Sequence, residues 1–95
     1  MTERVAIVDS SVPKLPRHIK LRFDTTRQQW LMLAPERVLM PDEIAVAILQ
    51  RCDGVATVAA IADELAAKFS APRDQVGRDI VQMLQDLADK GMVVA

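Results

Sequence analysis

The spacing of apolar residues changes once along this chain, from every second residue to every third or fourth, and the change falls at Pro41. Between residues 17 and 24, Ile19, Leu21 and Phe23 alternate with polar or basic side chains, which is typical of a strand with one buried face. From Pro41 onwards the apolar positions follow helical spacing. The sequence therefore predicts a sheet in the first half of the chain and helices in the second.

Three strands are expected before the change, and they follow one another closely enough to form an antiparallel meander. A polar loop separates the run 17–24 from a second strand at 30–34. Pro35-Glu36 suits the centre of the next tight turn because proline presets φ. Residues 37–40 then form a short third strand. In a sheet that follows sequence order this strand lies at an edge, where backbone N–H and C=O groups are unpaired.

Three helices are expected after the change. Asp53-Gly54 ends the first helix, with Gly54 in a left-handed cap, and Thr57 is the N-cap of the second. Pro72 suits the first position of the third helix, which Gly91 closes. The expected fold is α+β and winged-helix-like, with a three-stranded antiparallel sheet followed by a three-helix bundle.

The chain of 95 residues is large enough for one small domain. Residues 1–16, with a β-prone run at 5–8 followed by two prolines, are expected to form an extended N-terminal arm, and residues 17–95 the domain. Because such an arm can pair with the sheet edge of a second copy, a monomer and a strand-exchanged homodimer both stay open. The single cysteine and the lack of a signal-like or membrane-length apolar run predict a cytoplasmic protein.

The residues needed for most kinds of chemistry are missing. One cysteine and one histidine cannot supply the four ligands of a structural zinc site, and no glycine-rich phosphate loop is present. The only obvious nucleophile and base, Cys52 and His18, fall on different predicted elements, whereas nucleophilic catalysis needs them side by side. We expect no catalytic residue, no metal and no cofactor, and therefore no enzyme.

The third predicted helix is apolar over about 160° of its circumference, whereas a one-sided surface helix needs roughly 100°. Its apolar residues form two neighbouring stripes. The first stripe contains Val76, Ile80, Met83 and Leu87, and the second contains Gly77, Val81, Leu84 and Ala88. Both stripes could simply pack inside a three-helix domain. Alternatively, the first faces the core and the second lines a groove, where its small residues leave space for a ligand.

Such a groove would lie beside the third strand. An extended peptide can add a strand to the open edge while its side chains rest on the helix, which is a common mode of peptide recognition. On this hypothesis residues 17–95 form a single peptide-recognition domain. The candidate peptide-binding residues are Arg37, Val38, Leu39, Met40, Gly77, Val81, Leu84 and Ala88.

DNA binding is the alternative for three helices and a small sheet, with the third helix in the major groove. The charges argue against it. The chain has a net charge of −1, and residues 73–90 carry three Lys/Arg against four Asp. Because DNA-binding proteins neutralise several phosphates with Lys and Arg, neither nucleic acid nor an anionic membrane is an expected partner.

Several short segments together resemble the PqqD family, coenzyme PQQ synthesis protein D, over residues 13–93. They are Leu21-Arg22-x-Asp24, Arg27-x-x-Trp30-x-x-Leu33-Ala34-Pro35-Glu36-Arg37, Ile48-Leu49-x-x-Cys52-Asp53-Gly54 and Leu84-x-x-Leu87-x-x-Lys90-Gly91. Trp30 followed by Ala34-Pro35-Glu36-Arg37 is the most specific part.

The resemblance implies a noncatalytic peptide chaperone of pyrroloquinoline quinone (PQQ) biosynthesis. Proteins similar to PqqD bind the precursor peptide PqqA and present it to the radical S-adenosylmethionine enzyme PqqE, and they hold no metal or cofactor themselves. Related domains bind leader peptides as an added strand between the third strand and the third helix. That placement implies strand 37–40 and the second stripe of the third helix as the peptide site.

Overall fold

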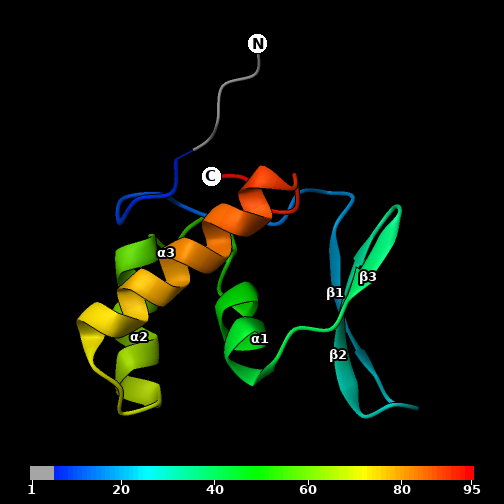
Figure 1. Cartoon of the computed structure of the whole chain (residues 1–95), viewed down its shortest axis with the longest axis horizontal. Coiled ribbons are helices and arrows are strands. Elements are labelled where there is room, and N and C mark those ends of the chain that lie inside the picture. Colours follow the sequence, from blue (N-terminus) through cyan, green and yellow to red (C-terminus); the bar gives the residue numbers. More distant parts are fainter. Residues whose placement is uncertain (1–5) are drawn as a thin grey trace.

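The structure is a computed structural model that describes residues 6–95. Three strands are followed by three helices (Figure 1), which confirms the predicted α+β class. The elements are β1 (Lys20–Asp24), β2 (Gln29–Ala34), β3 (Arg37–Leu39), α1 (Glu43–Gln50), α2 (Val58–Lys68) and α3 (Arg73–Asp89).

The sheet is an antiparallel meander with the strand order β1-β2-β3. Ala34 pairs with Arg37, so Pro35-Glu36 is the two-residue connection that the sequence predicts. Met32 on β2 lies opposite Leu21 on one side and Leu39 on the other, which places these three side chains on one face of the sheet. Because β3 pairs only with β2, its other side is an open edge among the described residues.

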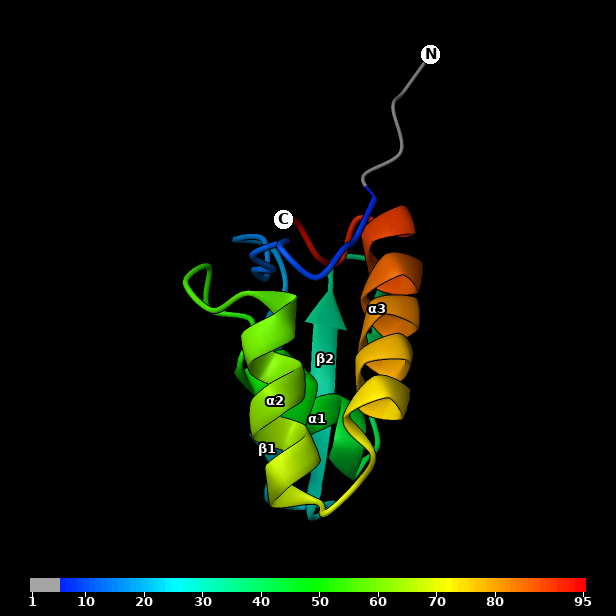
Figure 2. The ribbon, with the colours of Figure 1, turned by 90° about the vertical axis from the view of Figure 1, so that its left-hand side faces the viewer.

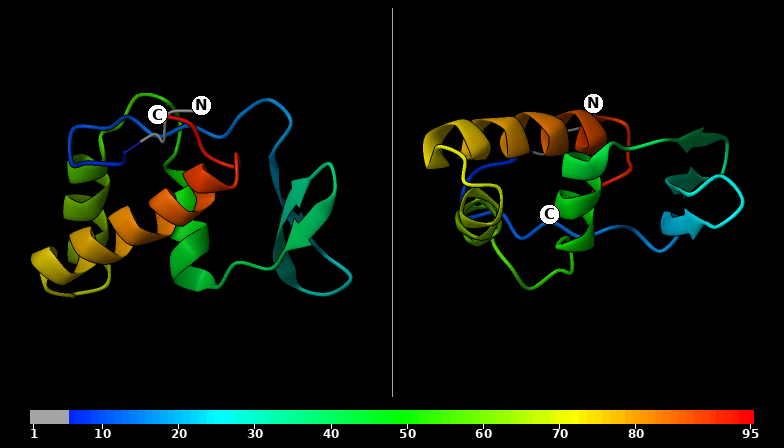
Figure 3. Two further views of the ribbon diagram at one scale, coloured as in Figure 1. Left: turned by 45° about the horizontal axis from the view of Figure 1, so that its top comes forward. Right: turned by 90° about the horizontal axis from the view of Figure 1, so that it is seen from below.

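All three helices lie on one side of the sheet (Figures 1 and 3). Seen from the helical side, α2 and α3 stand in front of β2 (Figure 2), and these two helices pack against each other. The centre of the core is formed by apolar side chains with almost no exposed surface, which are Met32, Ile48, Val58, Ile61, Leu65, Ile80 and Leu84. The core therefore fills the space between α1, α2, α3 and the inner face of the sheet.

Local capping interactions fix the ends of α2 and α3. Thr57 accepts a hydrogen bond from the N–H of Ala60, which confirms it as the N-cap of α2. At the end of α3, Gly91 has φ +75° and the N–H of Met92 donates to the carbonyl of Leu87 at 2.9 Å. This is a Schellman motif, and it turns Met92 back into the core, where it is 2% exposed.

The prediction that Gly54 caps α1 is wrong. The helix ends at Gln50, with Arg51 as its C-cap. Gly54 does have a positive φ, +80°, but it lies in the following loop, where its N–H donates to the carbonyl of Pro13 at 3.0 Å. The carboxylate of Asp53 accepts hydrogen bonds from the N–H groups two and three residues later, and these bonds lower its pKa. Asp53-Gly54 thus shapes a loop that holds the N-terminal segment.

Residues 7–14, which belong to the predicted arm, pack against the helices. Ile7 is only 4% exposed. The carbonyls of Ser11 and Asp9 accept hydrogen bonds from the N–H groups of the first two residues of α2, at 2.9 and 3.0 Å. These N–H groups have no partner within their own helix. Lys14 and Val94 join the two ends of the described chain through reciprocal backbone hydrogen bonds of 2.7 and 2.9 Å.

The β-prone run 5–8 includes Val5, which lies outside the described residues. In the part that is described, the N–H of Ile7 donates to Oε1 of Gln85 on α3 at 2.9 Å, and Val8 is 52% exposed. Residues 6–8 form no strand with the sheet. The strand-exchanged homodimer stays a prediction.

Candidate functional site

An apolar hollow of about 260 Å³ lies between β3, α1 and the second half of α3. We call it the methionine pocket. Its lining residues are Met32, Leu39, Met40, Pro41, Ala45, Leu49, Met83 and Leu87. Because a methionine side chain is unbranched and polarisable, it adapts to ligands of different shape. The pocket is therefore suited to a bulky apolar side chain.

The fold explains how these side chains meet. Leu39 pairs with Met32 across the sheet, and so both point towards the helices. Met83 and Leu87 lie one turn apart on the side of α3 that faces β3, since both line the same hollow as Leu39. Met40 follows the last residue of β3 and is 63% exposed, so the pocket opens to solvent at the sheet edge.

A second hollow, also of about 260 Å³, lies between the β2–β3 turn and the end of α3. Arg37, Lys90 and His18 line it together with Glu36. No ion pair joins Arg37 or Lys90 to any other residue within 6–95. We call this the basic hollow, because Arg37 and Lys90 outnumber Glu36 in its lining and form no ion pair within the described residues, which favours a carboxylate as ligand.

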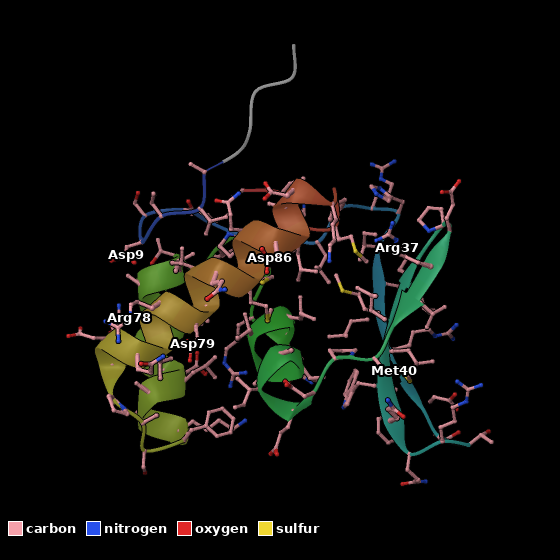
Figure 4. All side chains as sticks on the ribbon, in the orientation of Figure 1. Asp9, Arg37, Met40, Arg78, Asp79 and Asp86 are labelled. Atoms are coloured by element: carbon pink, nitrogen blue, oxygen red, sulfur yellow. The ribbon has the colours of Figure 1, made fainter. Side chains whose placement is uncertain are left out.

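The two hollows follow each other along the inner side of β3. Arg37 and Leu39 are two residues apart, so their side chains point to the same face of the strand. Figure 4 shows Arg37 and Met40 at the two ends of β3, with Asp79 and Asp86 on α3. The methionine pocket and the basic hollow together form what we call the β3–α3 groove.

Three of the predicted peptide-binding residues, Arg37, Leu39 and Met40, line this groove. Val38 does not, because alternation turns its side chain to the opposite face of β3, where it is 57% exposed. Leu84 is fully buried in the core and offers no surface to a ligand in this structure.

The remaining predicted residues of α3 lie away from β3. Gly77 and Val81 line a different hollow of about 630 Å³, beside Asp9 of the N-terminal segment. Ala88 is half-buried and packs against the core. The boundary between the two stripes of α3 faces the core, where Ile80 and Leu84 are buried. The wall of the β3–α3 groove therefore comes from Met83 and Leu87 of the first stripe, and not from the second stripe. A helical wheel gives the width of an apolar face but not its rotation against a sheet.

Gly77 makes room for a neighbouring side chain of its own helix. A Cβ atom at this position would lie 2.5 Å from Nη1 of Arg73. The Arg73 guanidinium forms an ion pair with Asp63 on α2 and also donates to the carbonyl of Ala59. Gly77 therefore serves the contact between α2 and α3 in this structure.

Trp30 lies apart from the β3–α3 groove. It contacts Phe23 edge to face, with the ring centroids 5.5 Å apart, on the helix-facing side of the β1–β2 hairpin. It lines a separate hollow with Phe69 and Lys68 near the ends of α2 and the hairpin. Trp30 therefore stabilises the packing of the hairpin against the helices.

Cys52 is buried, and its thiol donates to the carbonyl of Ile48 at 3.3 Å. Burial, with a smaller contribution from the negative charge of Asp53, raises the pKa of the thiol to about 12. A thiol that stays protonated at neutral pH is a poor nucleophile. Within residues 6–95 no three His, Cys, Asp or Glu side chains are grouped so that they could hold a metal ion.

The raised pKa of Cys52 predicts a loss of stability in alkaline solution. The unfolded thiol ionises near pH 9 and the folded thiol only near 12, so the unfolded state binds fewer protons between these values. The free energy of unfolding should therefore fall as pH rises from about 9 to 12, and the fall should be smaller in Cys52→Ala. Urea unfolding of both proteins from pH 8 to 11 measures the difference, and parallel curves would refute the assignment.

The comparisons with known proteins agree with this architecture. The family model described as coenzyme PQQ synthesis protein D (PqqD) matches residues 29–93. This chain belongs to the PqqD family. A relative from Rhodopseudomonas palustris strain TIE-1, called PqqA binding protein, is 61% identical over 90 residues, which are 95% of this chain and 88% of the relative.

Two solved PqqD structures are similar to this one. The solution structure of the PqqD part of Methylobacterium extorquens PqqCD, described as a functional and stand-alone RiPP recognition element, is 40% identical with a TM-score of 0.84 and covers 99% of this chain and 100% of that chain. The crystal structure of PqqD from Xanthomonas campestris is 39% identical with a TM-score of 0.57, over 90% and 94% of the two chains.

Some of the residues that carry the resemblance to PqqD stabilise the fold, and others line the β3–α3 groove. Trp30, Asp53 and Gly54 hold the hairpin and the N-terminal segment. Arg37 and Lys90 line the basic hollow, and Leu87 lines the methionine pocket. In the described part of this member of the PqqD family, no helix combines the length and hydropathy that a bilayer span requires.

Proposed function

We propose that this protein is a noncatalytic peptide chaperone of PQQ biosynthesis that acts in the cytoplasm. It binds the precursor peptide PqqA and presents it to the radical S-adenosylmethionine enzyme PqqE. The names of its relatives support peptide binding, since they are called PqqA binding proteins and one solved PqqD is described as a RiPP recognition element. The observation that carries the proposal is the open edge of β3 beside an apolar groove.

The peptide adds a fourth strand to the sheet at β3. Every second residue of β3 directs its N–H and C=O away from β2, towards the added strand. Each new backbone hydrogen bond contributes about 0.5–1.5 kcal/mol, and the ordering of a flexible peptide opposes binding by several kcal/mol. Contacts in the methionine pocket supply the rest of the affinity.

The two hollows fix which side chains the peptide presents. Alternate residues of the added strand point towards the helices, about 7 Å apart. One apolar side chain enters the methionine pocket, and an acidic side chain two residues away reaches the basic hollow with Arg37 and Lys90. A peptide with an aliphatic or aromatic residue and a carboxylate at this spacing fits the groove.

The backbone part of the proposal is tested with N-methylated peptides. Methylation removes one N–H donor without changing the side chain. Along the segment of PqqA that binds, we expect a period of two, in which alternate single methylations weaken binding at least tenfold and the intervening ones have little effect. A tenfold change corresponds to about 1.4 kcal/mol. Calorimetry with a scan of singly methylated peptides gives the pattern.

The scan has outcomes that contradict strand addition. A helical ligand would lose affinity at almost every methylated position, because nearly every N–H of a helix interior is bonded. A peptide held only by its side chains would show no period. The oligomeric state of the complex, monomer or strand-exchanged homodimer, follows from sedimentation of the same samples.

A further inference from the structure

No described element covers the face of the sheet that points away from the helices (Figure 3), and the strand register places apolar side chains on it. The strand register places Leu33 between Lys20 and Val38, and Leu31 beside Arg22. These side chains alternate with the core-facing ones and therefore lie together on the far side. We call the surface formed by these five residues the outer sheet face.

The outer sheet face is hollowed towards the β1–β2 turn. A hollow of about 300 Å³ is lined by Leu31, Leu33 and Arg22 together with residues at the end of β1. Both leucines are half-buried, although neither packs against the core. Val38 is 57% exposed at the margin next to the open edge of β3. Leu31 and Leu33 offer an apolar contact to a side chain from outside, beside the polar side chains of Arg22, Asp24 and Thr25.

Two basic side chains lie on the outer sheet face, and one of them, Arg22, lines the hollow, whereas the acid in its lining, Asp24, is paired with Arg27. Lys20 and Arg22 are exposed side chains of β1, and neither forms an ion pair with another residue in the described part of the chain. Unpaired cations beside a desolvated apolar contact favour a partner with carboxylates at matching positions.

Other occupants fit this surface less well. Insertion into a membrane needs protruding apolar side chains, whereas Leu31 and Leu33 form the floor of a hollow. Two cations neutralise too few phosphates for nucleic acid. A symmetric contact between two copies would bring Lys20 and Arg22 of each subunit close to those of the other, which opposes self-association through this face.

We propose that the outer sheet face docks a folded protein that presents an apolar side chain to Leu31 and Leu33 and carboxylates to Lys20 and Arg22, and that this protein is the enzyme that modifies the bound peptide. The inference rests on the proposed function. A strand added at β3 extends the sheet, so the side chains of the peptide that point away from the helices continue the outer sheet face beside Val38. The enzyme then contacts the chaperone and its peptide on one continuous surface.

The test compares two charge reversals of equal size, Arg22→Glu on the outer sheet face and Arg78→Glu on α3. The side chain of Arg78 is exposed and donates to Gln75 on its own helix. PqqE is titrated into the wild type and into each variant without peptide, and PqqA is titrated separately. We expect Arg22→Glu to weaken PqqE binding at least tenfold while PqqA affinity stays within twofold, and Arg78→Glu to leave both unchanged. Leu33→Ser, which removes part of the apolar floor, should also weaken PqqE binding alone.

Each contrary result has a defined meaning. If PqqE binds Arg22→Glu and Leu33→Ser as tightly as it binds the wild type, the proposed docking surface is wrong. It is also wrong if PqqE does not bind the wild type. If the wild type binds anionic phospholipid vesicles and Arg22→Glu does not, the partner of this face is a membrane. If sedimentation shows that the wild type self-associates and Arg22→Glu does not, the partner is a second copy of this chain. Failure of PqqA to bind the wild type refutes the proposed function separately, because PqqE binding is measured without peptide.

Discussion

Replacing Met83 by aspartate is expected to reduce the affinity for the precursor peptide by about 100-fold, which corresponds to about 2.7 kcal/mol. Met83 forms part of the methionine pocket and is only half-buried in the free protein, so the new carboxylate remains hydrated until a ligand covers it. Binding then removes water from a charge that has no cation beside it in the pocket. Calorimetric titration with PqqA measures the loss.

Val81→Asp is the matched control. Val81 is also half-buried and lies two residues away on the same helix, but it points about 160° away, into the hollow beside Asp9. This variant should bind the peptide like the wild type. If Val81→Asp lost affinity and Met83→Asp kept it, the peptide would lie on the other side of α3, as the two-stripe hypothesis expected. Circular dichroism of both variants verifies that they fold.

Replacing Ile7 by alanine is expected to lower the free energy of unfolding by about 2–3 kcal/mol, as for other large-to-small changes in a core. Ile7 is 4% exposed and belongs to the main apolar cluster, although it is the second residue of the described chain. In a domain of this size the loss corresponds to a fall in Tm of about 10 °C or more. Urea and thermal unfolding measure it.

The neighbouring Val8→Ala provides the control, because Val8 is 52% exposed. Its free energy of unfolding should change by less than about 0.5 kcal/mol. Equal and small effects at both positions would show that residues 7 and 8 behave as a loose arm in solution. A large effect at Ile7 alone would show that the N-terminal segment is part of the folded domain.

Much of the fold could be predicted because each element has a local signal. The alternation around Leu21, the two-residue turn at Pro35-Glu36 and the N-cap at Thr57 are all found where the sequence indicates them. These features depend on a few neighbouring residues, whose preferences agree with the tertiary structure. The existence of an open edge at β3 follows from the meander order alone.

The features that the sequence did not predict depend on contacts between distant segments. The rotation of α3 decides whether Met83 or Val81 faces β3, and the packing of Ile80 and Leu84 in the core fixes it. Gly54 has the local sequence signal of a helix cap, but its N–H is bonded to the carbonyl of Pro13, which is distant in the sequence. The sequence signal for an adaptable pocket is its five methionines. Their number alone does not show that Met32, Met40 and Met83 lie together.

The hydrogen bonds between Lys14 and Val94 have a consequence for how the domain can be built into larger proteins. They join the N-terminal segment to the end of the chain, and neither residue lines the β3–α3 groove. Domains whose ends lie together tolerate fusion and insertion well. Ile7 donates to Gln85 in the second half of α3, so the described chain begins as well as ends near the end of this helix (Figure 1), and one relative exists as the PqqD part of a PqqCD protein. A further domain fused at either end of the described chain would therefore leave the β3–α3 groove open.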